Sequence, residues 1–440
     1  MFHSDLTKLD YVTWRKFLSD ADLWDKAQQE QHQLKRLQQI LTISQRTLGY
    51  QNLYRGLDIQ IKELQDIRRL PLTSRKLFQT VGSTLFCAID GFSDATEKVT
   101  TGGSTGTPLA LYHTKREFHR ELASKAHQYS RIGWCEGERQ VVLRGLVQNE
   151  THYSFHPEYN ELRLSSYHLN DELILEQYWE AINRFRPEWI KCYPSSGFLL
   201  ASWMRENVLE LTGVRGILCA SENLYERQAN MLRSAFPEAT VFSHYGHYEL
   251  AALGSYCEYD PTYHMLPFYG YTELLNPAGD PVTERGEIGE IVATSFITEA
   301  MPIIRYKTGD LAKFVSNSCP HCGRPYMILE SIEGRTQDFL LNADGQYISL
   351  TALNFHDDTF ENVLEYQFIQ SEPGVIAINC VLVPGEDIND IRIRVQERLS
   401  CKLGRCTINI YQVLEIGKSK RGKAIPIIQS LANPYWGHDE

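Results

Sequence analysis

The sequence lacks any long uninterrupted apolar run and any excess of basic charge. No stretch approaches the roughly 18 apolar residues that span a bilayer, and the segment 1–25 mixes charged with aromatic residues. Lys and Arg number 44 against 55 Asp and Glu, a formal net charge of -11, which argues against a protein that binds duplex nucleic acid. Internal repeats and low-complexity linkers are also missing. We therefore expect a cytoplasmic globular protein that binds neither membranes nor nucleic acid.

The chain has enough length and apolar content to form more than one hydrophobic core. Its 440 residues are 42% hydrophobic, which predicts two or three domains, or one large domain with a smaller one. Ten cysteines are present. In a cytosolic protein these are expected to be free thiols, metal ligands or catalytic groups rather than disulfides.

Apolar strand-like runs alternate with helical patterns through the first half of the chain. This alternation predicts an α/β fold with a largely parallel, helix-flanked sheet, whose functional loops gather at the carboxyl ends of the strands. A long helix is expected over 23–48, and a helix start at Thr73 or Ser74. The expected strands are 109–112, 140–143, 189–193, 216–220 and 240–245, and the helices between them are 115–132, 172–184, 196–209 and 224–235.

The pattern changes after about residue 258 toward short strands and turns. From Asn342 onward the chain is typical of a small α+β unit, with strands expected over 375–383 and 407–414 and a helix over 387–399.

The first motif with chemical meaning is the run Thr100–Pro108, TTGGSTGTP. Glycines let a backbone approach phosphate oxygens closely, and successive N–H groups with Ser and Thr hydroxyls supply donors. No Lys-Ser or Lys-Thr follows the last glycine, so this is not a Walker A loop. The alternative is a solvent-exposed turn, and the density of small and hydroxyl residues favours a phosphate-binding loop over it.

Two further motifs place carboxylates beside an expected strand or turn. Tyr245–Glu249, YGHYE, directly follows a strand, where Glu249 could hold a magnesium ion on phosphates. Arg305–Asp310, RYKTGD, ends in Asp310, which could accept both hydroxyls of a ribose. Taken singly, a packed Tyr/His cluster and an ordinary charged turn explain these motifs better.

The last two motifs lie near and within the C-terminal unit. They are Glu333–Asp338, EGRTQD, and Gly417–Lys423, GKSKRGK. A mobile lysine in the second could neutralise charge that develops during adenylation. Each alone is better explained as a charged turn or a solvated basic segment.

Together and in this order, the five motifs resemble those of the adenylate-forming superfamily, which includes acyl-CoA ligases, luciferases and adenylation domains. The greatest similarity is to the phenylacetate–CoA ligase and CapK-like branch, which Pro71–Leu77 and Tyr263–Glu273 also resemble. The resemblance spans roughly residues 65 to 430.

The resemblance implies a large adenylation domain of helix-flanked mixed and parallel sheets over 1–336, and a mobile small α+β domain over 337–440. It implies activation of a carboxylic acid with ATP and Mg²⁺ to an acyl-adenylate, followed by transfer to coenzyme A with release of AMP. Aromatic residues near the expected pocket favour an aryl or arylacetic acid. A homodimer stays open, because relatives are often dimers.

Carried over residue by residue, the resemblance also implies site residues. Lys423 would bridge the carboxylate and the α-phosphate, Glu249 would hold Mg²⁺, and His247 would contact the substrate carboxylate or merely pack. The expected nucleotide contacts are Thr101, Gly102, Gly103, Ser104, Thr105 and Gly106 for the phosphates, Ser221, Glu222, Tyr245 and Gly246 around the adenine, and Asp310 with Arg335 for the ribose.

The chain departs from the family pattern at two positions. Tyr248 stands where Thr or Ser usually precedes the glutamate, and Gln337 stands where the hinge Asp or Lys is usual. Transfer of the acyl group to an amine, a carrier-protein thiol or another nucleophile therefore stays an alternative to coenzyme A. A non-catalytic nucleotide-binding protein on the same fold is the alternative from another class.

One cysteine pair has the spacing of a metal knuckle. Cys319-Pro-His-Cys322 is a CxxC, and zinc requires four ligands. Relatives carry a similar upstream Cys…His pattern, so we predict a Cys₃His structural zinc site that includes Cys257 and His264. His321 is an alternative ligand, and a metal-free turn with reduced thiols is the alternative for the whole motif.

Overall fold

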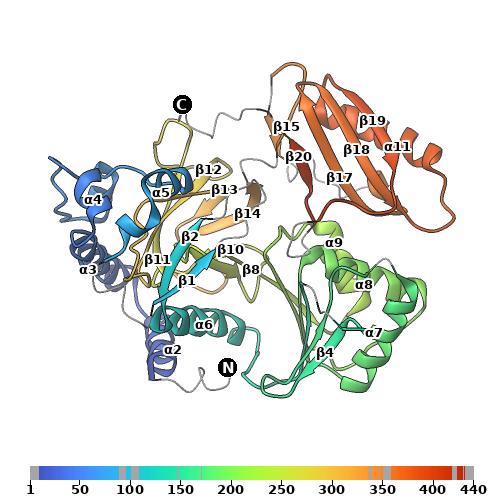
Figure 1. Cartoon of the computed structure of the whole chain (residues 1–440), viewed down its shortest axis with the longest axis horizontal. Helices are drawn as coiled ribbons and strands as arrows, with labels where there is room; N and C mark the ends of the chain where they lie inside the picture. Colours follow the sequence, from blue (N-terminus) through green and yellow to red (C-terminus); the bar gives the residue numbers. More distant parts are fainter. Residues whose placement is uncertain are drawn as a thin grey trace. The chain divides into compact units, whose positions relative to one another are not determined.

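The structure is a computed structural model that describes residues 9–88, 96–100, 109–145, 147, 149–169, 171–335, 339–345, 347–349, 358–418, 424–429 and 431. The chain divides into two compact units. Unit 1 comprises Met1–Glu136 and His244–Ile332, and unit 2 comprises Gly137–Ser243 and Glu333–Glu440. Figure 1 colours the elements of both units along the chain.

Unit 1 opens with helices, most of which begin at a side-chain cap. The helices are α2 (Leu9–Ala21), α3 (Lys26–Ser44), α4 (Leu48–Leu53), α5 (Arg75–Val81) and α6 (Lys115–Ser130), with short 3₁₀ turns η1 (Leu64–Arg69) and η2 (Ser83–Phe86). Ser74 caps α5 by accepting from the N–H of Leu77 (3.2 Å), which confirms the predicted helix start. Such a side-chain cap satisfies an N–H that the helix itself leaves unpaired.

The helix expected over 23–48 is present as α3, but it begins at Lys26 and ends at Ser44. Leu23 is 87% exposed and lies in the turn between α2 and α3. The reason is Asp25, whose carboxylate accepts from the N–H of Gln28 (2.9 Å) while the Gln28 side chain accepts from the N–H of Asp25 (3.1 Å). This capping box starts a new helix at Lys26.

The strands of unit 1 form a sheet whose recorded pairings are antiparallel. Its order is β11-β12-β13-β14-β10-β9-β8. The strands are β8 (Thr240–Gly246), β9 (Leu253–Tyr256), β10 (Tyr263–Met265), β11 (Gly270–Leu275), β12 (Ile288–Ser295), β13 (Tyr306–Ser316) and β14 (Ile328–Arg335). The change in character predicted near residue 258 therefore corresponds to a change from parallel to antiparallel pairing.

A separate hairpin in unit 1 carries the predicted phosphate loop. Strands β1 (Thr96–Thr100) and β2 (Ala110–Thr114) pair antiparallel, with Thr100 opposite Ala110. The predicted loop residues 101–106 connect these strands and lie outside the described residues.

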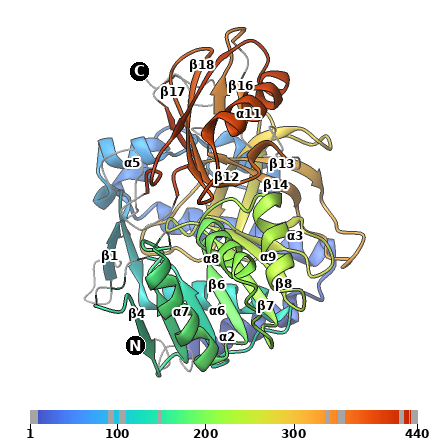
Figure 2. The ribbon, with the colours of Figure 1, turned by 90° about the vertical axis from the view of Figure 1, so that its right-hand side faces the viewer.

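The first part of unit 2 is the predicted parallel sheet. Its strand order is β7-β6-β3-β5-β4, parallel except for the edge strand β4. The strands are β3 (Gln140–Leu143), β4 (Tyr153–His156), β5 (Glu161–Leu164), β6 (Trp189–Cys192) and β7 (Gly216–Ala220), and the helices are α7 (Glu172–Phe185), α8 (Pro194–Glu206) and α9 (Glu226–Ala235). In Figure 2, α8 and α9 lie in front of β6 and β7. The helices and strands bury a common apolar core that includes Leu143, Tyr178, Ile190 and Leu200.

The second part of unit 2 is the small α+β unit predicted from Asn342 onward. Its four-stranded sheet has the order β19-β18-β17-β20. The elements are β17 (Val363–Glu372), β18 (Val375–Leu382), α11 (Ile388–Leu403), β19 (Thr407–Gln412) and β20 (Ile427–Gln429), and a two-stranded ribbon pairs β15 (Phe339–Leu341) with β16 (Tyr347–Ser349). The domain boundary predicted at residue 337 falls among residues that the structure does not describe and stays a prediction.

In the part of the chain that the structure describes, no helix combines the length and the apolar content that a membrane crossing demands.

Candidate functional site

The YGHYE motif places a buried ion pair at the end of β8. The Glu249 carboxylate, 8% exposed, lies 3.3 Å from Nδ1 of His247 and accepts from the Tyr306 hydroxyl (3.0 Å). Burial opposes ionisation of Glu249, but His247 and the Tyr306 hydroxyl outweigh it and lower the pKa of Glu249 to about 2. Burial also opposes protonation of His247, and Glu249 nevertheless raises the pKa of that imidazole. The arrangement keeps Glu249 an anion, which is the state a cation ligand needs.

The second carboxylate predicted for the nucleotide, Asp310, lies in the same unit. The Tyr245 hydroxyl on β8 donates to Asp310 Oδ2 (2.8 Å). Tyr245 is 9% exposed, and burial together with Asp310 raises the pKa of its phenol well above the ordinary value. Tyr245 therefore remains a hydrogen-bond donor to Asp310 at neutral pH. Two motifs that are 65 positions apart in sequence meet through this contact.

A bulge in the pairing of β12 with β13 sets the direction of the Asp310 side chain. The register shifts between Glu290 and Val292 on β12, so that Thr308–Asp310 bows out of the ladder. Gly309 adopts φ 76°, a left-handed conformation that suits glycine, and its N–H donates to Glu290 Oε1 (3.1 Å). Bulges of this kind re-aim side chains near functional sites. Asp310 is therefore neither in a simple turn nor in a regular strand.

Arg305, at the start of the same motif, has a structural role. Its guanidinium forms a two-point ion pair with Glu273 (Nε–Oε2 2.9 Å, Nη2–Oε1 3.0 Å) and donates to the carbonyls of Arg68 (3.0 Å) and Leu70 (2.6 Å). Arg305 is 5% and Glu273 4% exposed. The sequence did not identify Glu273 as this partner, although the resemblance included the stretch that contains it. A fully bonded buried Arg–carboxylate pair fixes the backbone that leads to Asp310.

Backbone strain accompanies two of these motifs. Leu250, which follows Glu249, has φ 53°, and Arg305 has φ 44°. Positive φ is costly for residues with a Cβ, and such residues cluster at functional sites. Tyr248, which departs from the family pattern, is 53% exposed. Its carbonyl oxygen lies 3.1 Å from Nε2 of His113.

The adenine-side motif belongs to unit 2. Ser221, with φ 72°, and Glu222 follow β7 directly, the position at which ligand-binding residues occur on parallel sheets. Gly246, at the end of β8, belongs to unit 1, where a Cβ would come within 3.0 Å of Leu253 Cδ1.

Several predicted site residues cannot be placed. The loop residues 101–106 and Lys423 lie outside the described residues, and so does Gln337. Arg335 ends β14, and its side chain is not described. The roles predicted for these residues stay predictions.

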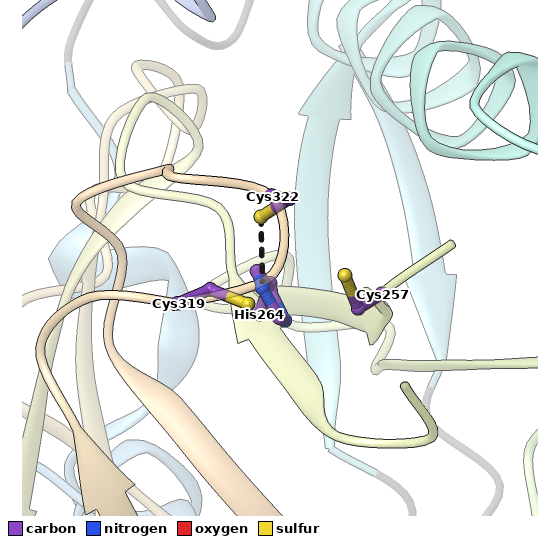
Figure 3. Close-up of side chains that lie close together, drawn as sticks. All are labelled: Cys257, His264, Cys319 and Cys322. Carbon is purple, nitrogen blue, oxygen red and sulfur yellow. Dashed lines mark hydrogen bonds between the residues drawn. The ribbon is translucent and has the colours of Figure 1, made fainter. Parts of the chain in front are cut away.

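The four predicted zinc ligands converge within unit 1. One ligand atom from each of Cys257, His264, Cys319 and Cys322 lies within 4.8 Å of all the others. Figure 3 shows the four side chains close together, and Cys322 Sγ lies 3.4 Å from Nε2 of His264. Tetrahedral zinc with Zn–S bonds of about 2.3 Å places its sulfur ligands about 3.8 Å apart. The spacing of the four side chains therefore fits zinc.

Two hairpins supply these ligands. Cys257 and His264 flank the turn between β9 and β10, and Cys319 and Cys322 lie between β13 and β14. β10 also pairs with β14, with His264 opposite Ile328, which brings the two turns to the same place. Gly323, at φ 74°, donates its N–H to the carbonyl of Cys319 (2.9 Å) and closes the knuckle.

Hydrogen bonding prepares His264 for a metal. Its Nδ1 lies 3.2 Å from the carbonyl of Thr262, so Nδ1 carries the proton and Nε2 presents a lone pair. Burial lowers the pKa of His264 to about 4, which keeps the imidazole neutral. Burial raises the pKa of Cys257 to about 12, and a bound cation reverses such a shift by favouring the thiolate. The alternative ligand His321 is exposed.

A partly buried ionic network surrounds the four ligands. Arg324 forms two hydrogen bonds to Glu258 (2.9 and 2.8 Å), the neighbour of Cys257. Asp22, at the end of α2, accepts from Arg131 (3.0 Å) and Tyr326 and lies 3.0 Å from Nε2 of His127. These contacts tie α2 and α6 to the knuckle, and Leu18 of α2 packs in the same core cluster as Cys257 and Cys319.

Comparisons with known proteins agree with this geometry. No protein-family model matches the sequence. The chain is 24% identical to protein CapK of Staphylococcus aureus over 325 residues, which are 70% of this chain and 69% of CapK. It is 32% identical to the phenylacetate-coenzyme A ligase of Thermus thermophilus over 178 residues, which are 36% of this chain and 37% of that enzyme.

A solved structure shares the fold over most of the chain. It is a 2-hydroxyisobutyryl-CoA ligase in the postadenylation state in complex with R3-HIB-AMP, with a TM-score of 0.75 and 17% sequence identity over 93% of this chain and 91% of that one. The two sequence relatives and the predicted order of motifs agree with this similarity in structure. The chain is thus similar in sequence to CapK and to a phenylacetate-coenzyme A ligase, and it shares the fold of a 2-hydroxyisobutyryl-CoA ligase.

Proposed function

We propose that the protein activates a carboxylic acid with ATP and then passes the acyl group to coenzyme A. In the first step a carboxylate oxygen attacks the α-phosphorus of ATP and pyrophosphate leaves. In the second step the thiol sulfur attacks the acyl carbon and AMP leaves. The observation that carries the proposal is the contact between Tyr245 and Asp310, because it joins two of the five motifs that define the expected nucleotide site.

The residues of unit 1 suit the handling of a nucleotide. We assign Asp310 to the ribose hydroxyls, since Tyr245 occupies Oδ2 at 2.8 Å and holds the carboxylate in one orientation. Glu249 would hold Mg²⁺ on the phosphates, and when bound that ion neutralises phosphate charge. His247 lies 3.3 Å from Glu249, which raises the pKa of the imidazole; in its protonated form His247 would favour binding of the substrate carboxylate.

The acid is expected to be aryl or arylacetic. Support comes from the aromatic residues of the predicted pocket segments and from the similarity to a phenylacetate-coenzyme A ligase. A panel of arylacetic, benzoic, short aliphatic and hydroxylated acids, with pyrophosphate release as the readout, tests this preference. The preference is wrong if short aliphatic acids support faster release than every aromatic acid.

Coenzyme A is the proposed acceptor because relatives on this branch are CoA ligases. Release of AMP that requires coenzyme A, measured once the adenylate has formed, tests the assignment. Release that instead requires an amine or a carrier protein would redirect the second step and leave the first intact. We propose a cytoplasmic location as well, and the need for ATP and coenzyme A together with ten free cysteines supports it.

We further propose that Cys257, His264, Cys319 and Cys322 hold one structural zinc ion. The donor set is closed, because four protein ligands complete a tetrahedron and leave no position for a substrate. Cys257, His264 and Cys319 are all buried, which also suits a structural ion. When bound, zinc would cross-link the two hairpins that carry β9–β10 and β13–β14.

A further inference from the structure

The base of the loop that carries the predicted catalytic lysine is well fixed, although residues 419–423 themselves are not described. On one side Gly417 accepts from the N–H of Ile425 (3.2 Å). Gln367 of β17, 2% exposed, donates its amide N–H to the carbonyl of Ile425 (2.7 Å). Directly beyond, Ile427 pairs with Phe368 in the parallel β20–β17 ladder. Both ends of the loop are therefore anchored to the small sheet of unit 2.

Glu222 contacts this base from the other part of unit 2. Its Oε1 accepts from the N–H of Ala424 (3.0 Å), and its Oε2 accepts from the N–H of Ser195 (3.0 Å) at the start of α8. One carboxylate thus bridges the turn after β7, the N-terminus of α8 and the base of the lysine loop. Ser221, at φ 72°, bends the chain at the position just before Glu222.

The contact reaches the residue next to the predicted catalytic group. The N–H of Ala424 is the amide of the peptide bond that joins Lys423 to Ala424. Because the peptide bond is planar, a hydrogen bond at this amide fixes the position of the described residue at which the lysine loop ends.

We infer that Glu222 is a positioning residue for the first half-reaction, because it docks the base of the lysine loop on the adenine-side turn. The inference rests on the proposed function for what Lys423 does, and on the two hydrogen bonds for what Glu222 does. Glu222 acts through Lys423 and touches neither the reacting carboxylate nor the α-phosphate.

The chemistry of the contact requires a carboxylate. An ionised Glu accepts at both oxygens, and hydrogen bonds to a charged acceptor are the stronger kind. A glutamine can accept at one position only, and its NH₂ group would face a second N–H donor. Glu222→Gln therefore keeps the size of the side chain and loses one of the two hydrogen bonds.

A second contact holds the two parts of unit 2 together independently of Glu222. The Arg227 guanidinium lies 4.7 Å from the centre of the Phe198 ring and donates to the carbonyl of Val363. This contact joins α8 and α9 to β17 without Glu222. Loss of Glu222 should therefore release the loop base while the two parts of unit 2 stay joined.

The test compares Glu222→Gln with Glu176→Gln, an exposed glutamate on α7, in the full chain. Acid-dependent pyrophosphate release should fall about tenfold in Glu222→Gln, the size of one lost charge-assisted hydrogen bond, and thiolysis of a supplied acyl-adenylate should change by less than about twofold. In a Lys423→Ala background the same substitution should have no further effect on pyrophosphate release. Affinity for AMP should be unchanged.

Hydrogen exchange provides a readout that needs no activity. Peptides that contain Ala424 should exchange faster in Glu222→Gln than in the parent chain, and Glu176→Gln should leave them unchanged. Equal exchange in all three proteins would overturn the docking role. Weaker AMP binding, or an equal loss in the Lys423→Ala background, would show that Glu222 contacts the nucleotide itself and would also overturn the inference. A parent chain that forms no adenylate from any acid refutes the proposed function instead, and the exchange result still decides whether Glu222 docks the loop.

Discussion

The metal cluster and the nucleotide site differ in how they are built. All four ligands of the cluster lie in one unit, on two hairpins that β10 and β14 hold together. The residues predicted for the nucleotide belong to both units, with Ser221 in unit 2 and Asp310 in unit 1. The cluster is thus a local consequence of strand pairing, whereas the nucleotide site depends on segments far apart in the chain.

The two sites also differ in what their charges do. At the cluster, the four donor atoms lie within 4.8 Å of one another, and an ionic network surrounds them. At the nucleotide site, Glu249 and Asp310 are already held by His247, Tyr306 and Tyr245. We take this to mean that the cluster serves stability and the paired carboxylates serve chemistry.

The largest effect is expected from loss of a zinc ligand. Cys319→Ser should abolish bound zinc and lower the thermal midpoint by more than about 5 °C, because structural zinc contributes folding free energy directly. Elemental analysis and thermal unfolding check this. The control is Cys135→Ser, at an exposed cysteine of the same unit. It should change neither the zinc content nor the thermal midpoint. If the gently purified parent protein holds much less than one zinc ion per chain, the cluster is not a zinc site.

Arg305 lies in a motif predicted for the nucleotide, but its ion pair with Glu273 gives it a structural role. Arg305→Met leaves the buried carboxylate of Glu273 unpaired and should cost about 3–5 kcal/mol of unfolding free energy. Denaturant unfolding measures the cost. The exposed Arg285 is the matched position, where substitution by Met should stay within about 0.5 kcal/mol. Equal stabilities of the two variants would mean that the pair with Glu273 contributes little.

Lys423 should affect chemistry without affecting stability. Lys423→Ala should slow acid-dependent pyrophosphate release about 100-fold or more, the cost of losing one preorganised contact to transition-state charge. Thiolysis of a preformed adenylate should fall by less than about threefold. Rapid-quench assays of each half-reaction separate the two. Equal losses in both half-reactions would contradict the assigned role, and a lower thermal midpoint would show that Lys423 is structural.

The smallest effect is a pH dependence that originates beside the cluster. Burial opposes ionisation of Asp22, but hydrogen bonds and charges from His127, Arg131 and Tyr326 hold its pKa well below the ordinary range. Because the folded pKa is the lower one, the stabilisation is complete above the unfolded pKa of about 3.9 and is lost as the pH falls through the folded pKa.

Asp22→Asn should therefore cost about 2 kcal/mol at pH 7, and the difference from the parent should shrink below pH 4. Urea unfolding between pH 2 and 7 measures it. Asp10→Asn, which removes a more exposed partner of Arg116, is the control and should give a small, nearly flat difference. A difference between Asp22→Asn and the parent that does not change with pH would show that the carboxylate charge is not what stabilises this position.

Much of the fold could be predicted because local patterns determine it. The strands at 140–143 and 216–220 and the start of the helix at 172 match the structure, since apolar periodicity and capping residues act over a few positions. The helix expected from residue 23 begins at Lys26, although the Asp25–Gln28 capping box that sets this start is visible in the sequence. The preceding helix α2, Leu9–Ala21, was not predicted. Strands β17 and β20 were not predicted, and β20 has only three residues, too few to show a period.

The candidate site was predictable in its residue types and not in its contacts. The CxxC spacing and the upstream Cys and His identified all four residues of the cluster. No local signal connects Arg305 with Glu273 or Glu222 with Ala424, because these pairs are 32 and 202 positions apart. Contacts of that kind follow from how strands and domains pack, which one sequence does not specify.

Acid-dependent pyrophosphate release in the presence of ATP and Mg²⁺ decides whether the chain forms the proposed acyl-adenylate. Release should require one class of carboxylic acid, and free AMP and loss of free thiol should appear when coenzyme A is added. A folded protein that binds no ATP and releases no pyrophosphate with any acid of a broad panel would contradict it.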